Sequence, residues 1–425
     1  MKQLLFFILI SYSIACPGQI DEAKSIIKEL TASKMHGRGY VKKGDKIAAK
    51  YIKKQFEAIG LQRFEKSYYQ KFSFPINTQP GALELRINNA LLIPGVDYLI
   101  DPSSPSIKGT YNTTILTPKD LLNSELFFSK LNNSAGKILL VNCYNMKHLS
   151  KQETTSIREI IRYLKYSPEH PALATIVFNS EKLTWSGSTT QSQKASFTVS
   201  KQFDLEKIET ISVRSKSDFE KKYTSQNCIG FIPGISNDSI VVISAHYDHL
   251  GRMGSKTYFP GANDNASGIA MLLQTAKYFA RPENKPKHML VFMAFGAEEI
   301  GLLGSKYFTE NPLFPLVKIK FLINLDLAGT GDKGIQVVNG SIFKPQFERL
   351  KEINKQHKLL PEVKTRGSAC NSDHCYFYEK NIPCFFIYTL GGTRAYHDIY
   401  DQYKTLPLTE FTNYNKLIRL FIKQL

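Results

Sequence analysis

The most constraining feature of the sequence is a strand-and-turn stretch at residues 239–268. Apolar and β-branched residues at 240–245 predict a buried strand that ends at His246, with Asp248 two residues later. Asp264 then lies in GANDNASG, a run of turn-forming residues that opens a predicted helix. In open α/β sheets, ligands bind at the carboxyl ends of strands. These imidazole and carboxylate groups therefore fit either a structural ion pair or a metal site.

The second half of the chain alternates between apolar strands and amphipathic helices. The runs VVISA, MLVFMAF, FLINLDLAG and PCFFIYT read as strands, and helical segments separate them. Continuous apolar strands of this kind predict an α/β fold with a mainly parallel, mixed sheet that helices cover on both faces. Upstream, residues 21–32 and 45–61 carry helical periods on either side of a glycine-rich loop, HGRGY. The extended run YYQKFSF follows as a predicted edge strand.

Residues from about 90 to 220 have a different texture. Short strand-like runs are separated by Ser, Asn, Thr and Gly, with one helix near IREIIRYLK. We therefore expect a small β-rich domain at 90–222, inserted between an N-terminal part at 20–89 and a main domain at 223–425. Neither acidic nor histidine residues cluster in this segment, and we expect His148 and His170 to lie on its surface.

The net charge of +18 would suit a nucleic-acid or membrane partner. However, the lysines are scattered and form no nucleic-acid motif, so we expect a solvated basic surface and no nucleic-acid partner. Residues 1–18 read as a signal peptide, with an apolar run at 4–10 followed by small residues, which predicts a secreted, periplasmic or cell-envelope protein. That run is too short to span a membrane, and no later segment is predicted to do so. The residues that end at Cys16 weakly resemble a bacterial lipoprotein box, so a lipid anchor at Cys16 is an alternative to release of the cleaved chain.

The cysteines fall into one pair that could form a disulfide in an oxidising compartment and three expected to be buried. Cys370 and Cys375 flank the sequence NSDH and are near enough for a local disulfide. Cys143, Cys228 and Cys384 lie in apolar runs and are expected to be buried as small hydrophobic residues. Since the sequence has no CxxC pair, a thiolate zinc knuckle is not expected.

Five side chains with metal-ligand chemistry lie close to predicted strand ends: His246, Asp264, Glu299, Asp326 and His397. Two imidazoles with three carboxylates suit zinc. If one carboxylate bridges, the five can hold two Zn²⁺ ions about 3.5–4 Å apart, which can share a hydroxide. Asp264 is the natural bridge, because its tight turn lets a short side chain reach both ions. A single Asp after a strand is commonly only a helix cap, so the prediction rests on the whole set.

Two further carboxylates have separate expected roles. Glu298 and Glu299 are adjacent after one strand, so one can coordinate a metal while the other acts as a general base on metal-bound water. The alternative is a solvated acidic pair at a helix start, favoured by the helix dipole. Asp248 is expected to bond to the distal nitrogen of His246 and fix its tautomer, with a loop cap as the alternative. His249 is expected to be exposed rather than a ligand.

The motifs SAHYDHLG, GANDNASG, AFGAEEIGLLGS, NLDLAG and YHDIYD, in this order, resemble the co-catalytic di-zinc aminopeptidases. That family includes secreted leucyl aminopeptidases, glutamate carboxypeptidase, glutaminyl cyclases and the metal-free transferrin receptor ectodomain. The resemblance implies one zinc on His246, Asp264 and Asp326, a second on Asp264, Glu299 and His397, and Glu298 as the base. It also implies a cis peptide at Asp264–Asn265, and residues 90–222 resemble the family's protease-associated insert in texture.

A further run, SDHCYFYEKNIPCFF, resembles a family segment beside the pocket, with Asn381 in place of the usual Gly. The resemblance places Ser372, Asp373 and His374 near the pocket without a catalytic role. Arg394 and Tyr396 precede His397 in a Gly-rich loop and are candidates for contact with substrate or an oxyanion.

The leading functional hypothesis is a secreted zinc exopeptidase that removes N-terminal residues from peptides. A carboxypeptidase or dipeptidase would need a basic group for the terminal carboxylate, and the sequence does not locate one. A glutaminyl cyclase on the same fold is a further alternative, although the complete ligand set favours hydrolysis. A receptor-like binding module that has lost the chemistry is the alternative outside the enzymes.

Overall fold

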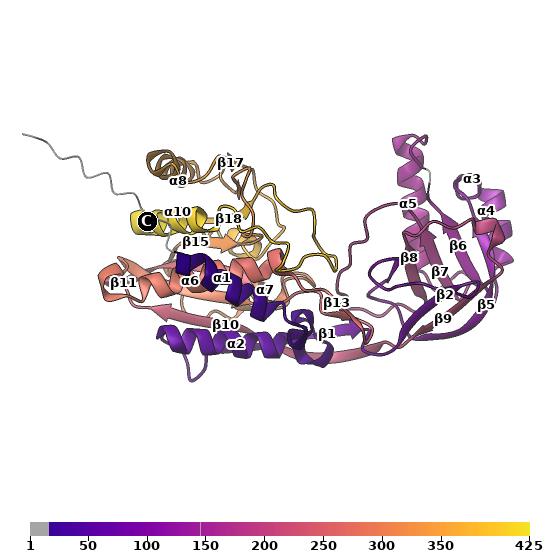
Figure 1. The fold of residues 1–425 in the computed structure, drawn as a ribbon, viewed down its shortest axis with the longest axis horizontal. Coiled ribbons are helices and arrows are strands. Elements are labelled where there is room, and N and C mark those ends of the chain that lie inside the picture. Colours follow the sequence, from indigo (N-terminus) through magenta and orange to yellow (C-terminus); the bar gives the residue numbers. More distant parts are fainter. Residues whose placement is uncertain (1–16, 145) are drawn as a thin grey trace, which may run out of the picture.

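The computed structural model describes residues 17–144 and 146–425. The expected lipid anchor at Cys16, and the predicted signal peptide apart from its last two residues, lie outside the described residues. The chain forms two lobes, a main lobe and a smaller one at the right of Figure 1. Within the described ranges, no helix is long and apolar enough to cross a membrane.

The main lobe is built on an eight-stranded mixed sheet. In spatial order its strands are β1 (Tyr69–Thr78), β10 (Asp218–Ile232), β14 (His288–Phe295), β11 (Ser236–His246), β15 (Ile319–Leu325), β18 (Cys384–Thr389), β16 (Ile335–Val338) and β17 (Val363–Thr365). The central strands β14, β11, β15 and β18 are parallel to one another, whereas β10 and β16 are antiparallel to their inner neighbours. The predicted α/β fold class is confirmed, and the carboxyl ends of the central strands meet at one edge.

Helices cover both faces of this sheet. One face carries α1 (Pro17–Leu30), α2 (Gly44–Ile59), α6 (Gly268–Phe279), α8 (Lys344–His357) and α10 (Phe411–Gln424), and the other carries α7 (Leu303–Glu310) and α9 (Cys375–Glu379). Along β11, Val241 and Ile243 face the first set of helices, while Ile240 and Val242 face the second. Because both faces are buried, the strands read as continuous apolar runs.

The smaller lobe contains a second eight-stranded sheet. Its order is β3 (Ala90–Leu91), β2 (Leu83–Ile87), β9 (Thr210–Ser215), β5 (Ile107–Leu116), β6 (Ile138–Asn142), β7 (Ala174–Phe178), β8 (Ala195–Val199) and β4 (Tyr98–Ile100). We refer to residues 83–215 as the insert. The sheet begins at Leu83, earlier than the expected boundary at residue 90, because β2 pairs with β9 from the far end of the insert.

The insert contains more helix than the sequence predicted. Besides α5 (Lys151–Tyr166), which was expected, it has α3 (Pro118–Leu122) and α4 (Ser124–Asn132). These helices are too short to show a helical period, and side-chain caps from Thr117 and Asn123 start them. His170 is buried rather than exposed, since its Nε2 lies 2.9 Å from the carbonyl oxygen of Leu164 at the end of α5. His148 is exposed, as expected.

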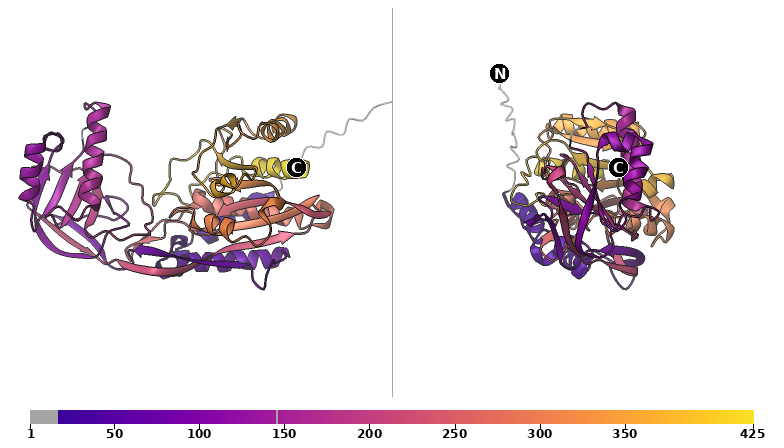
Figure 2. Two further views of the ribbon diagram at one scale, coloured as in Figure 1. Left: turned by 180° about the vertical axis from the view of Figure 1, so that it is seen from behind. Right: turned by 90° about the vertical axis from the view of Figure 1, so that its right-hand side faces the viewer.

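Two extended strands join the lobes. β1 and the long β10 pair antiparallel along the lower side of the molecule, and the ribbon reaches the insert in both side views (Figures 1 and 2). A small ribbon of β12 (Arg252–Met253) and β13 (Thr257–Tyr258) lies in the loop after β11.

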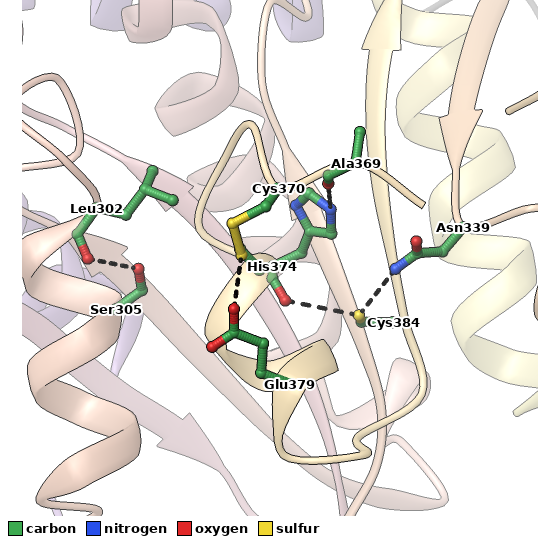
Figure 3. The surroundings of a disulfide bond; sticks show 9 residues. Leu302, Ser305, Asn339, Ala369, Cys370, His374, Glu379 and Cys384 are labelled. Carbon is green, nitrogen blue, oxygen red and sulfur yellow. Dashed lines mark hydrogen bonds between the residues drawn. A yellow bond between two sulfur atoms is a disulfide. The ribbon is translucent and has the colours of Figure 1, made fainter. Parts of the chain in front are cut away.

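The cysteine predictions are confirmed. Cys370 and Cys375 form a disulfide, with Cα atoms 4.8 Å apart (Figure 3). The cysteines at positions 143, 228 and 384 are free and buried. Burial raises the pKa of the Cys384 thiol to about 12, so this group is an inert part of the core.

Candidate metal centre

The parallel strands bring the predicted ligands to one edge of the main sheet. His246 is the last residue of β11, and Asp326 directly follows β15. Glu299 lies in the turn after β14, and Asp264 lies in the irregular turn that opens α6. His397 comes from the long loop between β18 and α10.

All five side chains converge. His246 Nε2 lies 3.3 Å from Asp264 Oδ1 and 3.4 Å from Asp326 Oδ1. His397 Nε2 lies 3.1 Å from Asp264 Oδ2 and 3.0 Å from Glu299 Oε2. Asp264 therefore directs one carboxylate oxygen to each of two imidazole–carboxylate groups, which is the arrangement expected of a bridging ligand.

The chemistry of this donor set fits cations. His246, Asp264 and Asp326 are buried, and Asp326 Oδ1 has no hydrogen-bond partner in the described part of the chain. Several buried carboxylates in one cluster are costly unless positive charge compensates them. Nitrogen and oxygen ligands in this ratio suit Zn²⁺, with His246, Asp264 and Asp326 around one position and Asp264, Glu299 and His397 around the other.

The pKa values reflect the same concentration of charge. Burial alone would lower the pKa of His397, but Glu299 and Asp264 outweigh that effect and raise it to about 11. Burial likewise opposes the charged form of His246, and the carboxylates again raise its pKa well above the ordinary value. Burial alone would raise the pKa of Glu299, yet its neighbouring histidines lower it to about 2. The carboxylates of the centre therefore favour positive charge at the positions of both imidazoles.

Glu298 and Glu299 point apart, as expected. Glu299 faces His397, whereas Glu298 lines the adjoining pocket with its Oε2 4.0 Å from His246 Nε2. Burial and the nearby carboxylates, including Asp373, raise the pKa of Glu298 well above its usual range, although His246 opposes them. A carboxylate with a raised pKa is suited to accept and return a proton near neutral pH.

Asp248 has a different contact from the one expected. Its carboxylate lies 3.8 Å from His246 Nδ1, too far for a hydrogen bond, and that nitrogen instead lies 3.3 Å from the Asp248 backbone oxygen. The carboxylate accepts hydrogen bonds from the backbone amides of Glu298 at 3.1 Å and Glu299 at 3.4 Å. Asp248 therefore holds the turn that carries both glutamates, and burial raises its pKa to about 7.

The expectation that His249 is exposed is wrong. Its side chain is buried, and its Nδ1 lies 2.5 Å from Glu299 Oε1. Glu299 thus directs one oxygen to His249 and the other to His397. The burial arises because the loop after His249 packs against the insert, a contact that the local sequence does not signal.

Arg38, in the HGRGY loop, is a site residue that the sequence analysis missed. The side chain is fully buried. Its guanidinium donates hydrogen bonds to the backbone carbonyls of Tyr247 (2.7 Å), Leu30 (3.1 Å), Pro260 (2.6 Å), Gly261 (2.8 Å) and Asp264 (3.0 Å). A Cβ at Gly37 would lie 2.4 Å from the Gly251 carbonyl oxygen, so the flanking glycine permits this close packing. The position of this arginine between two glycines is the sequence feature that could have indicated its buried, close-packed role.

Asp401, the last residue of YHDIYD, is the second missed residue. Its carboxylate accepts hydrogen bonds from the backbone amides of Asn263 at 2.8 Å and Asp264 at 2.9 Å. It therefore supports the turn that carries the bridging carboxylate. The Asp264–Asn265 peptide in this turn is cis, as the family resemblance implied.

A pocket of about 140 Å³ opens beside the ligands. Apart from the ligands and Glu298, it is lined by Leu327, Arg366, Asn371, Phe386, Tyr388 and Tyr396. Tyr396 is therefore among the residues that line the pocket, whereas Arg394 is exposed and is not part of this lining. Ser372 lies behind the wall, where its hydroxyl donates to Asp326 Oδ2 at 3.2 Å.

The disulfide lies in the segment that contributes Asn371 to the lining of this pocket. Figure 3 shows the Cys370–Cys375 bond beside His374, whose Nε2 lies 2.8 Å from the carbonyl oxygen of Ala369. Burial lowers the pKa of His374 to about 4, so the ring is neutral and structural. Both features brace the loop that contributes Asn371 to the pocket.

Comparison with known proteins identifies this domain. The sequence pattern of peptidase family M28 matches residues 227–422, which include all five converging side chains. Residues 227–422 therefore form a region similar to peptidase family M28. The M28 fold extends over both lobes in solved structures: a zinc aminopeptidase from Bacillus subtilis aligns with a TM-score of 0.67 at 19% identity, covering 95% of this chain and 94% of the other. An aminopeptidase from Aneurinibacillus sp. strain AM-1 aligns with a TM-score of 0.62 at 21% identity, covering 95% and 93%.

Curated relatives match over shorter stretches of sequence. Aminopeptidase YwaD of Bacillus subtilis is 27% identical over 74% of this chain and 67% of its own length. Leupeptin-inactivating enzyme 1 of Streptomyces exfoliatus is 34% identical over 38% of this chain. The chain spans only 35% of that Streptomyces protein and 48% of a probable leucine aminopeptidase of Arthroderma otae.

Proposed function

We propose that this protein is a zinc-dependent exopeptidase that hydrolyses N-terminal residues from peptides. The observation that carries the proposal is the shared carboxylate of Asp264, one oxygen of which faces His246 and the other His397. One ion would be held by His246, Asp264 and Asp326, and the other by Asp264, Glu299 and His397. Two zinc ions bound there would polarise the scissile carbonyl and lower the pKa of water.

Glu298 is the proposed general base. It lines the pocket with its Oε2 4.0 Å from His246 Nε2, farther than the oxygens of Asp264 and Asp326, and its pKa is raised. It would accept a proton from the attacking water and return it to the leaving amine. Asp248 would position this group through its hydrogen bond to the Glu298 amide.

The pocket supports exopeptidase rather than endopeptidase activity. Its volume of about 140 Å³ suits roughly one side chain, and Phe386, Tyr388 and Tyr396 give it an aromatic wall. Relatives named as aminopeptidases support removal of an N-terminal residue rather than a C-terminal one. We therefore propose peptides with apolar N-terminal residues as substrates.

A carboxypeptidase or dipeptidase is the second candidate, because Arg366 also lines the pocket. Its Nη1 donates to the Tyr388 hydroxyl at 3.4 Å, leaving other donors of the guanidinium to bind a carboxylate. Comparing aminoacyl anilides with acyl-dipeptides and free dipeptides separates the two functions. An Arg366→Met variant that loses activity only on substrates with a free carboxylate would favour the second candidate.

We also propose that the protein is exported. The signal peptide expected at residues 1–18 would direct the chain to an oxidising compartment, and the Cys370–Cys375 disulfide supports such a location. Mass spectrometry of the native secreted chain, with and without reduction, tests both the cleavage site and the disulfide.

Metal analysis provides the decisive experiment. We expect chelator-treated protein to lose hydrolysis of leucyl anilide, to recover it with zinc, and to bind two ions per chain. A protein that binds one ion or none, or that keeps full activity in excess chelator, would contradict the proposal.

A further inference from the structure

The loop that carries His397 reaches out of the main lobe to the insert. In Figure 1 this yellow part of the chain extends toward the smaller lobe. Lys182 of the insert donates from Nζ to the carbonyl oxygens of Arg394 at 2.7 Å and Tyr396 at 3.0 Å. The same ammonium pairs with Asp398 Oδ2 at 2.7 Å. One insert side chain thus contacts the backbone on the N-terminal side of His397 and the carboxylate that follows it.

A second insert residue contacts His397 itself. The backbone amide of Trp185 donates to the carbonyl oxygen of His397 at 2.9 Å. Trp185 is firmly held, because its Nε1 donates to the Ile100 carbonyl at 2.7 Å and its ring stacks on Phe259 with centroids 4.9 Å apart. The backbone of His397 is therefore tied to the core of the insert.

The His397 loop needs such external support. His397 has a φ of 53°, a left-handed conformation that costs free energy in a non-glycine residue. Asp398 accepts a hydrogen bond from the Tyr400 amide at 2.8 Å, but its side chain is only 6% exposed and depends on Lys182 for a counter-charge. The loop between β18 and α10 itself contains no helix or strand in the described chain.

The insert also supports the connection between His246 and Asp264. Leu250, Met253 and Phe259 from that connection belong to the hydrophobic core of the insert. The connection that leads to Asp264 and the loop that carries His397 are therefore both packed on the insert.

We propose that the insert is a structural part of the metal centre, with Lys182 and Trp185 as positioning residues that hold His397 over the second cation position. The inference rests on the proposed function for the identity of the cation, but the contacts themselves do not. It assigns the insert a role in assembling the site. The half of the centre formed by His246 and Asp326 has no direct contact from Lys182 or Trp185 in the described structure.

The test compares Lys182→Met with Lys201→Met in the full chain. Lys201 is a matched control, since it pairs with Asp97 at 3.8 Å inside the insert and is similarly exposed, at 48% against 45%. Zinc titration of chelator-treated protein should show about 10- to 100-fold weaker binding of one ion in Lys182→Met, with the other unchanged. Lys201→Met should bind both ions as the parent does.

Two readouts need neither zinc nor activity. Trp185 is the only tryptophan in the sequence, so its fluorescence reports this contact directly. We expect Lys182→Met to increase acrylamide quenching of Trp185 and to speed hydrogen exchange at the amides of residues 394–400, without a loss of global stability. Parental quenching, exchange and zinc affinity in Lys182→Met would overturn the inference. If the parent binds no zinc but the exchange difference persists, the proposed function fails while the positioning role stands.

Discussion

The bridging role of Asp264 can be tested by comparing three isosteric substitutions. Asp264→Asn keeps the shape of the side chain, but it replaces one of the two bridging oxygens with an amide NH2 group and removes the negative charge that both halves of the centre share. Asp326→Asn alters only the half around His246, and Glu299→Gln alters only the half around His397. We expect two zinc ions per chain in the parent, one in each single-half variant and none in Asp264→Asn at micromolar zinc.

The size of the effect follows from the distances. A unit negative and a unit positive charge 3.3 Å apart, the distance between Asp264 Oδ1 and His246 Nε2, interact by about 5 kcal/mol at an effective dielectric constant of about 20, and a divalent cation held at that distance would interact with the carboxylate more strongly. Even about half of that interaction approaches the ~2.8 kcal/mol that corresponds to a 100-fold change in affinity. The contact with His397 at 3.1 Å implies a similar loss in the other half.

Isothermal titration of chelator-treated protein, with elemental analysis after gel filtration, measures the stoichiometry. Circular dichroism of each variant controls for folding. Loss of a single ion in Asp264→Asn, or of both ions in each of the other two variants, would show that the carboxylate does not bridge.

Three further predictions concern Glu298, His397 and Arg38. Glu298→Gln should keep both zinc ions but lower kcat on leucyl anilide by about 10²- to 10⁴-fold, and unchanged turnover would remove Glu298 from its role. The pKa of His397 is raised to about 11, so in chelator-treated protein its contribution to stability is complete below about pH 6.5 and is lost as the pH rises toward 11. Between pH 7 and pH 9, the free energy of unfolding measured with urea should therefore fall more for the parent than for His397→Gln. Arg38→Met should lower the free energy of unfolding by at least about 3 kcal/mol, because it leaves several buried carbonyls unpaired, whereas exposed Arg214→Met should change it by less than about 0.5 kcal/mol.

The main sheet and the convergence of the ligands were predictable because they depend on local patterns. An apolar run that ends at His246 or just before Asp326 defines a buried strand, and parallel strands bring their carboxyl ends together. The separate directions of Glu298 and Glu299 likewise follow from adjacent positions on one turn. Their roles in binding and catalysis remain predictions.

The errors share a different cause. His249 is buried, and the carboxylate of Asp248 supports the glutamate turn rather than His246, because of packing between segments that lie far apart in the sequence. The fully buried Arg38 illustrates the same limit, since its role depends on carbonyls more than 200 positions away. No periodicity in the HGRGY loop indicates those partners.

The same limit explains why His397 could be named from its motif while its support could not. The motif YHDIYD supplies the imidazole, but nothing in those residues indicates that the backbone around it is held by Lys182 and Trp185. A loop with a left-handed residue at its ligand and no regular secondary structure depends on contacts from outside for its conformation. Because the insert provides such contacts through Lys182 and Trp185, substitutions at these positions should alter the proposed zinc affinity before they alter the fold of the main lobe.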